Sequence, residues 1–111
     1  MTVTSVLAQA TVRDLDRAER WYATLFGRAP DSRPMDGLIE WHLTADAGVQ
    51  LWRDPERAGR STTVLGVSDV DAAARDLAAA GVAHAGPEPG GGSRVVRLDD
   101  PDGNRVVLIG D

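Results

Sequence analysis

Apolar residues recur at steps of three and four positions in two stretches of the chain, and each stretch predicts an amphipathic helix. In the first stretch Asp14 is a suitable N-cap and Gly27 a suitable stop. In the second, Asp69 and Gly81 take the same two roles. The apolar stripes are Leu15, Ala18, Tyr22, Leu25 and Phe26 in the first helix, and Val70, Ala73, Ala74 and Leu77 in the second.

Segments with β-type composition surround both helices, one before each helix and three after it. The predicted strands are residues 4–12, 28–33, 38–43 and 49–52 in the first half, and 62–67, 82–85, 94–98 and 105–109 in the second. The predicted order is therefore βαβββ, twice.

A short motif supports an internal duplication. The run of residues 12–18, VRDLDRA, returns as VSDVDAA at residues 67–73, which is 55 positions later. We interpret residues 1–111 as a single domain, with module one at 1–53, a linker at 54–61 and module two at 62–111. Because each module is too small to bury a core alone, the two must pack together, and we expect function at their junction.

Two loops carry specific expectations. Residues 86–93, GPEPGGGS, are rich enough in glycine to form either a slack surface connection or a lid. Residues 100–104, DPDGN, lie between two apolar strands and predict a hairpin turn.

Composition and charge narrow the class of protein. The chain has no cysteine, which excludes disulfides and thiolate chemistry and suits a reducing compartment, so we expect a cytoplasmic protein. All 12 basic residues are arginines scattered along the chain, and the net charge is −5, which argues against a nucleic-acid partner. No apolar run has membrane-spanning length. The acidic balance favours a cationic or neutral small ligand.

The pattern resembles the vicinal oxygen chelate superfamily, which includes glyoxalase I, extradiol dioxygenases and bleomycin resistance proteins. The resemblance is carried by VRDL at 12–15, Trp21-Tyr22, LFG at 25–27, and DPDGN followed by VVLI at 106–109. It implies an α+β fold of two βαβββ modules with curled mixed sheets around a shared cavity. It also implies a homodimer whose ligand grooves are completed at the subunit boundary, with the modules paired within one chain or exchanged between chains.

The resemblance places metal ligands of catalytic members at Leu7, Thr62, Gln50 and Val107. Of these only the glutamine offers a side chain that reaches a metal, and no His, Asp, Glu or Cys lies within two residues of any of them. We therefore predict no catalytic metal and no cofactor. A displaced site built from Glu40, His42 and Gln50 is the remaining metal or proton-transfer alternative.

Alternation along the strands predicts the cavity lining. Leu38 to Leu43 leaves open whether Trp41 or the pair Glu40 and His42 faces inward, whereas Trp52 follows Gln50 on one face. The predicted ligand-binding residues are Leu7, Gln9, Trp41, His42, Gln50, Trp52, Thr62, Val64, Arg97 and Val107. Such an apolar lining with a few neutral polar groups suits a planar organic molecule.

Two functional hypotheses follow. The first is a metal-independent binding protein of the glyoxalase and bleomycin resistance type, which holds an aromatic or cationic ligand, such as an antibiotic, without changing it. The second is a metal-free isomerase, cyclase or lyase that uses His42, Glu40 or Arg97. We rank the second lower because no nucleophile and base pair is evident in the sequence.

Overall fold

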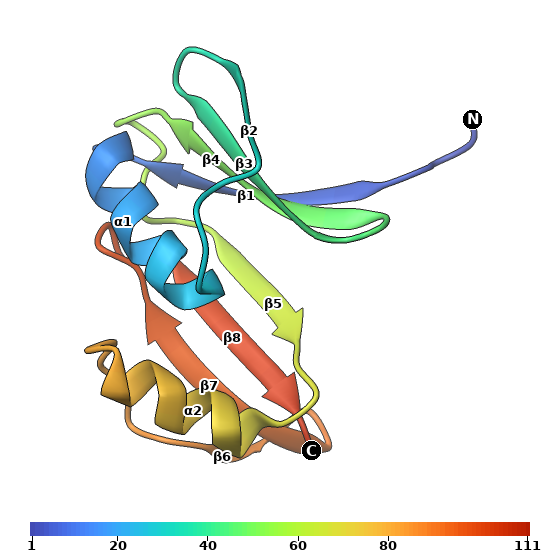
Figure 1. Ribbon diagram of the computed structural model, residues 1–111, viewed down its shortest axis with the longest axis vertical. Coiled ribbons are helices and arrows are strands. Elements are labelled where there is room, and N and C mark those ends of the chain that lie inside the picture. The colour runs from blue at the N-terminus through green and yellow to red at the C-terminus, as the bar shows by residue number, and fades with distance from the viewer.

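A computed structural model describes all 111 residues and consists of two four-stranded sheets, each with one helix (Figure 1). The first module contains β1 (Val6–Val12), α1 (Leu15–Phe26), β2 (Ser32–Met35), β3 (Leu38–Thr44) and β4 (Ala47–Arg53). The second contains β5 (Thr62–Gly66), α2 (Val70–Ala79), β6 (Glu88–Gly90), β7 (Ser93–Asp99) and β8 (Arg105–Gly110). The predicted order of βαβββ, twice, is confirmed.

Both sheets have the same topology. Their strand orders are β1-β4-β3-β2 and β5-β8-β7-β6. In each sheet the first strand of the module pairs in parallel with the last, and the other pairs are antiparallel. The sheets are therefore mixed, as the resemblance implied. Neither helix is long and apolar enough to cross a bilayer.

The two helices begin as their capping residues predict. The Asp14 side chain accepts a hydrogen bond from the backbone N–H of Arg17, and the Asp69 side chain accepts one from that of Ala72. Gly27 ends α1 in the left-handed region at φ 72°, which L-residues with a side chain rarely adopt. The end of α2 falls slightly before the predicted stop at Gly81.

One hydrophobic core serves both modules and lies on the helix-facing sides of the two sheets. In Figure 1, α1 lies between the first sheet and the second module. The fully buried side chains include Val12, Tyr22, Ile39, Trp41 and Leu51 from module one and Val70, Val96, Leu98 and Val106 from module two. The expectation that the modules share a core is met.

Hydrogen bonds from the turn between β7 and β8 also connect the two modules. The buried Asp100 carboxylate accepts from the Tyr22 hydroxyl at 2.8 Å, which ties the turn to α1. The Asn104 side chain, fully buried, donates to the Thr11 carbonyl at 2.8 Å and accepts from the Ser61 backbone N–H at 2.9 Å. Burial and the nearby Asp100 charge together raise the pKa of the Tyr22 phenol above its ordinary value.

The linker passes close to this turn. Gly59 has φ +84°, and its backbone N–H donates to the Thr11 carbonyl at 3.3 Å. A Cβ atom at Gly59 would lie 2.4 Å from the Asp102 carbonyl oxygen, so only glycine fits both the conformation and the space.

Three predicted segments differ from the structure. Residues 82–85 form no strand; instead His84 accepts from the Gly86 N–H at 3.0 Å and its Nε2 lies 2.9 Å from the Ala74 carbonyl oxygen. The predicted loop 86–93 contains β6, which pairs with β7. Strand β2 begins later than predicted and includes Pro34. Proline has no backbone N–H, and β2 tolerates it because an edge strand pairs with a neighbour on one side only and so needs fewer N–H donors.

Candidate functional site

Each sheet has a second face, turned away from the helices, which we call its open face. Strand register places alternate side chains there, and most of them are accessible to solvent, although Val95 on β7 is buried. The open face of the first sheet carries Leu7, Gln9, Thr11, Leu38, Glu40, His42, Gln50 and Trp52. The open face of the second carries Thr62, Val64, Arg97, Arg105, Val107 and Ile109.

The expectation that Trp41 lines the ligand site is wrong, because its side chain is fully buried in the core. Its ring centroid lies 5.4 Å from that of Phe26 and 6.2 Å from that of Tyr22, and its indole N–H donates to the Arg28 carbonyl at 3.0 Å. The alternation of β3 therefore turns Glu40 and His42 to the open face, which answers the question that the sequence left open.

A chain of hydrogen bonds crosses the open face of the first sheet. Gln9 Nε2 donates to Gln50 Oε1 at 3.1 Å, and Gln50 Nε2 donates to Glu40 Oε2. His42 Nε2 lies 3.1 Å from Glu40 Oε1. We call these four residues the polar cluster. Hydrogen bonds from Gln50 and His42 lower the pKa of the Glu40 carboxyl, so it is ionised at neutral pH.

Trp52 lies beside the polar cluster, two residues beyond Gln50 on the same face of β4, where it is half-buried. The turn between β2 and β3 leaves room for its ring, because a Cβ atom at Gly37 would come within 3.3 Å of Trp52 Cζ3. An indole that remains accessible beside amide groups is suited to stacking a flat ligand and orienting it.

The open face of the second sheet differs in chemistry. Val64, Val107 and Ile109 give it an apolar strip along β5 and β8, and Thr62 and Arg105 lie at one end of that strip. Arg97 is exposed on β7, and its Nε lies 3.1 Å from the Glu88 carboxylate on β6. This ion pair is open to solvent, so it contributes little to stability.

The predicted cavity shared by the two modules is not enclosed by one chain. No cavity brings together predicted ligand-binding residues of the two modules. Leu7 and His42 line a shallow cavity of about 250 Å³ at one end of the first open face. The helices account for this arrangement, because both sheets turn their helix-covered sides toward the common core.

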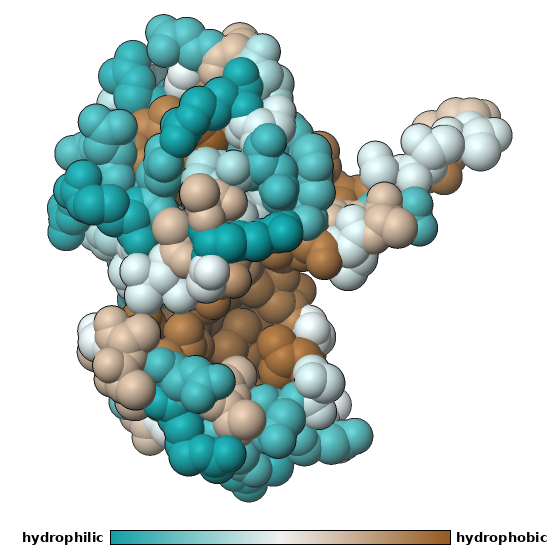
Figure 2. Space-filling view, viewed as in Figure 1, coloured by the Kyte–Doolittle hydropathy of each residue, from teal (hydrophilic) through white to brown (hydrophobic).

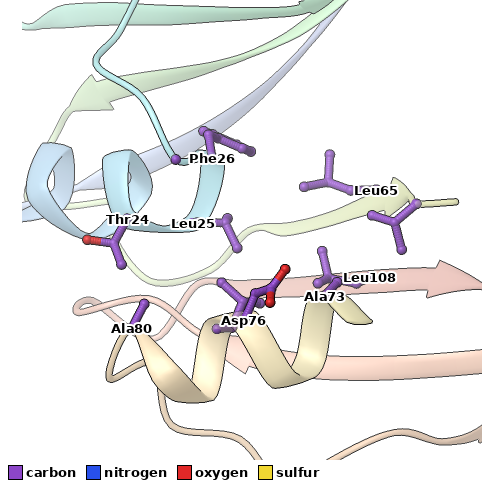
Figure 3. A pocket seen from close by; sticks show the side chains of 11 residues that line it. Thr24, Leu25, Phe26, Leu65, Ala73, Asp76, Ala80 and Leu108 are labelled. Carbon is purple, nitrogen blue, oxygen red and sulfur yellow. The ribbon is translucent and has the colours of Figure 1, made fainter. Parts of the chain in front are cut away.

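An apolar recess lies between the two modules, at the junction where we expect function, but Val64 is the only predicted ligand-binding residue among those that line it. Figure 2 shows it as a hydrophobic recess between two more polar lobes. It consists of two adjoining cavities of about 340 and 460 Å³ that share Phe26, Leu65 and Val67, and Figure 3 shows the first, between α1 and α2. The helical periodicity predicts that Leu25 and Phe26 face the core, and it gives no signal that they also border a recess.

The donor set does not fit the divalent metal that catalytic relatives hold. Leu7 and Val107 offer no ligand atom, and Gln50 already uses its amide oxygen and nitrogen within the polar cluster. Nowhere does the chain gather three or more His, Cys, Asp or Glu side chains in a group able to hold a metal. A divalent transition metal prefers several imidazole or carboxylate ligands at one point.

Comparison with known proteins identifies the family. Residues 4–108 match the pattern of the glyoxalase/bleomycin resistance protein/dioxygenase superfamily, and the chain belongs to this superfamily. Among proteins of curated function, none matches this chain.

Solved structures agree with this assignment. A glyoxalase/bleomycin resistance protein from Catenulispora acidiphila DSM 44928 is 30% identical, with 96% of this chain and 97% of that chain covered and a TM-score of 0.87. TnmS3, an antibiotic-binding protein from Streptomyces sp. CB03234, is 27% identical, with 99% and 98% covered and a TM-score of 0.83. A bleomycin-binding protein solved with bleomycin is 20% identical, with 100% and 99% covered and a TM-score of 0.79, and shows the fold alone.

Proposed function

We propose that this protein is a metal-independent binding protein that holds a planar aromatic molecule, such as an antibiotic, on the open face of the first sheet. The observation that carries the proposal is the accessible indole of Trp52 beside a chain of hydrogen-bonded amides, in which Gln50 occupies a position where the resemblance places a metal ligand. The likeness to an antibiotic-binding protein across nearly the whole chain supports it.

The test uses acridine, a planar aromatic that is neutral at mildly alkaline pH. Isothermal titration calorimetry should detect binding, and the Trp52→Ala variant should bind about tenfold or more weakly because it lacks the stacking partner. Trp21→Phe is the matched control, since it removes an indole from α1, and should leave the affinity unchanged. Equal affinity of Trp52→Ala and the wild type would refute the proposed site.

We also propose that the site is completed by a second copy of this chain. The open faces expose apolar side chains, with Leu7 41% and Val64 60% accessible, and exposed apolar surface of this kind is typical of an interface between proteins. Analytical ultracentrifugation should give a dimer, and Val64→Asp should yield monomers while Ala78→Asp, on the exposed side of α2, should not. A monomeric wild type at micromolar concentration would contradict this arrangement.

A second candidate function rests on the His42–Glu40 contact. A carboxylate that accepts from Nε2–H leaves Nδ1 free to take a proton from a ligand, which is the arrangement of a general base. Arg97 does not belong to this pair, because it lies on the other sheet and contacts Glu88. Chromatography of a ligand incubated with the protein separates the two functions, since a binding protein returns the ligand unchanged and an enzyme yields a product that His42→Ala abolishes.

A further inference from the structure

The polar cluster is organised around one carboxylate. Gln9, Gln50 and Glu40 lie opposite one another on β1, β4 and β3, so their side chains form a row across three strands. Gln9 donates to Gln50, and Gln50 uses its own N–H to donate to Glu40. His42, two residues farther along β3, approaches the other carboxylate oxygen of Glu40. The donors converge on Glu40 and fix its orientation.

The charge of this carboxylate has no permanent cationic partner. In every other ion pair of the chain an arginine faces the acidic group. Glu40 instead faces His42, which is charged only when protonated. The guanidinium of Arg28 lies nearby but is used by the His42 carbonyl and by Asp31. Within one chain, the open face of the first sheet therefore carries a carboxylate that no arginine neutralises.

The position of this charge suits a substituent on a stacked ring. The Glu40 side chain is 13% exposed and that of His42 is 55% exposed, so the cluster borders solvent. Trp52 and Glu40 are diagonal neighbours on adjacent antiparallel strands, because Glu40 pairs with Gln50 and Leu38 pairs with Trp52. Such neighbours lie roughly 7–8 Å apart, about the reach from a ring centre to a substituent.

We propose that Glu40 determines the specificity of this face by selecting planar ligands that carry a cationic N–H donor, such as a protonated amine or amidine. This inference rests on the proposed function and names its ligand class. A cationic donor that reaches the carboxylate forms a charge-assisted hydrogen bond, which is stronger than one between neutral groups. An anionic ligand of the same shape meets repulsion at the same point.

Three probes of one shape test the proposal at mildly alkaline pH: 9-aminoacridine, a cation; acridine, which is neutral; and acridine-9-carboxylate, an anion. The wild type should bind 9-aminoacridine about tenfold more tightly than acridine, and the carboxylate least. Glu40→Gln preserves the shape of the side chain while removing its charge, so the affinities for 9-aminoacridine and acridine should become about equal, whatever the change in the affinity for acridine itself. Glu56→Gln, in the exposed linker, is the matched control and should keep the preference.

A second variant tests the charge without altering Glu40. His42→Lys places a permanent cation beside the carboxylate at an exposed position and should also abolish the preference, whereas His42→Gln should keep it. If acridine binds but the preference is absent from the wild type, or persists in Glu40→Gln, the inference is overturned and the binding function stands. If none of the three acridines binds, both fall together.

Discussion

The hydrogen bond between Tyr22 and Asp100 predicts a measurable loss of stability in Tyr22→Phe. Phenylalanine retains the ring and its packing against Trp21, Phe26 and Trp41, so the change removes only the hydroxyl. The lost bond joins a buried donor to a buried carboxylate at 2.8 Å. Hydrogen bonds to charged groups contribute about 1.5–3 kcal/mol, and burying the hydroxyl offsets part of this.

Asp100 keeps three other donors in Tyr22→Phe, which sets the cost near the lower end of that range. These are the backbone N–H groups of Asp102 and Asn104, both at 2.9 Å, and the Asn104 amide at 2.8 Å. We expect a decrease of about 1.5–2 kcal/mol in the free energy of unfolding. With a urea m-value of about 1–2 kcal/mol per M, the midpoint should fall by about 1 M.

Urea unfolding followed by tryptophan fluorescence measures this change, with an unchanged m-value as the sign that only stability has moved. Thr24→Val is the matched control, because it removes an exposed hydroxyl that bonds the Arg20 carbonyl within α1, and should cost under about 0.5 kcal/mol. A Tyr22→Phe effect as small as that of the control would refute the reasoning. In an Asp100→Ala background, Tyr22→Phe should cost much less, because its partner is gone.

Three further predictions follow from the same contacts. Tyr22 is the only tyrosine, and its pKa is raised in the folded protein, so its contribution to stability is complete below the ordinary phenol pKa of about 10 and is lost as the pH rises above that value. Tyrosinate absorbance should therefore appear together with unfolding. Titration of Tyr22 near pH 10 in the folded protein would contradict this prediction. Gly59→Ala should lower the midpoint of thermal unfolding, because the new Cβ atom would clash with the Asp102 carbonyl. Gly86→Ala should lower it less, because Gly86 also has a positive φ but has open space around it. Equal shifts for the two variants would show that the steric contact at Gly59 has no effect on stability. Arg33 lowers the pKa of Glu19, so this ion pair stabilises the folded protein above the ordinary Glu pKa, and its contribution is lost as the pH falls. Because Arg33 is well exposed, Glu19→Gln should lower the free energy of unfolding in urea by under about 1 kcal/mol at neutral pH. A larger loss would contradict the interpretation as a surface ion pair.

The fold was largely predictable because its signals are local. Asp14, Asp69 and Gly27 are capping residues whose effect depends on their own backbone, and strand alternation reports burial directly. The short segment 82–85 was misread because an apolar valine in a loop resembles a strand position. Val82 is buried, yet no strand pairs with it.

The site was predictable only in part, because it depends on how elements face one another. The positions of Gln9, Gln50 and Trp52 on one face follow from alternation, but the orientation of Trp41 depends on a helix packing against the other side of the sheet. The recess between Phe26 and Leu65 depends on the angle between modules, which no local pattern encodes. The hairpin turn at Asp100 was recognised, but its contact with Tyr22 joins residues 78 positions apart.

That contact has a consequence for how the chain matures on the ribosome. Asp100 is synthesised 78 residues after Tyr22, its hydrogen-bond partner, and Asn104 is synthesised 93 residues after its partner Thr11. Module one therefore lacks these contacts until the turn between β7 and β8 has been synthesised, and its aromatic side chains remain less protected until then. Nascent chains stalled before the hairpin of β7 and β8 should be recognised by chaperones and cleaved by proteases, whereas chains that include β8 should lose this vulnerability in one cooperative step.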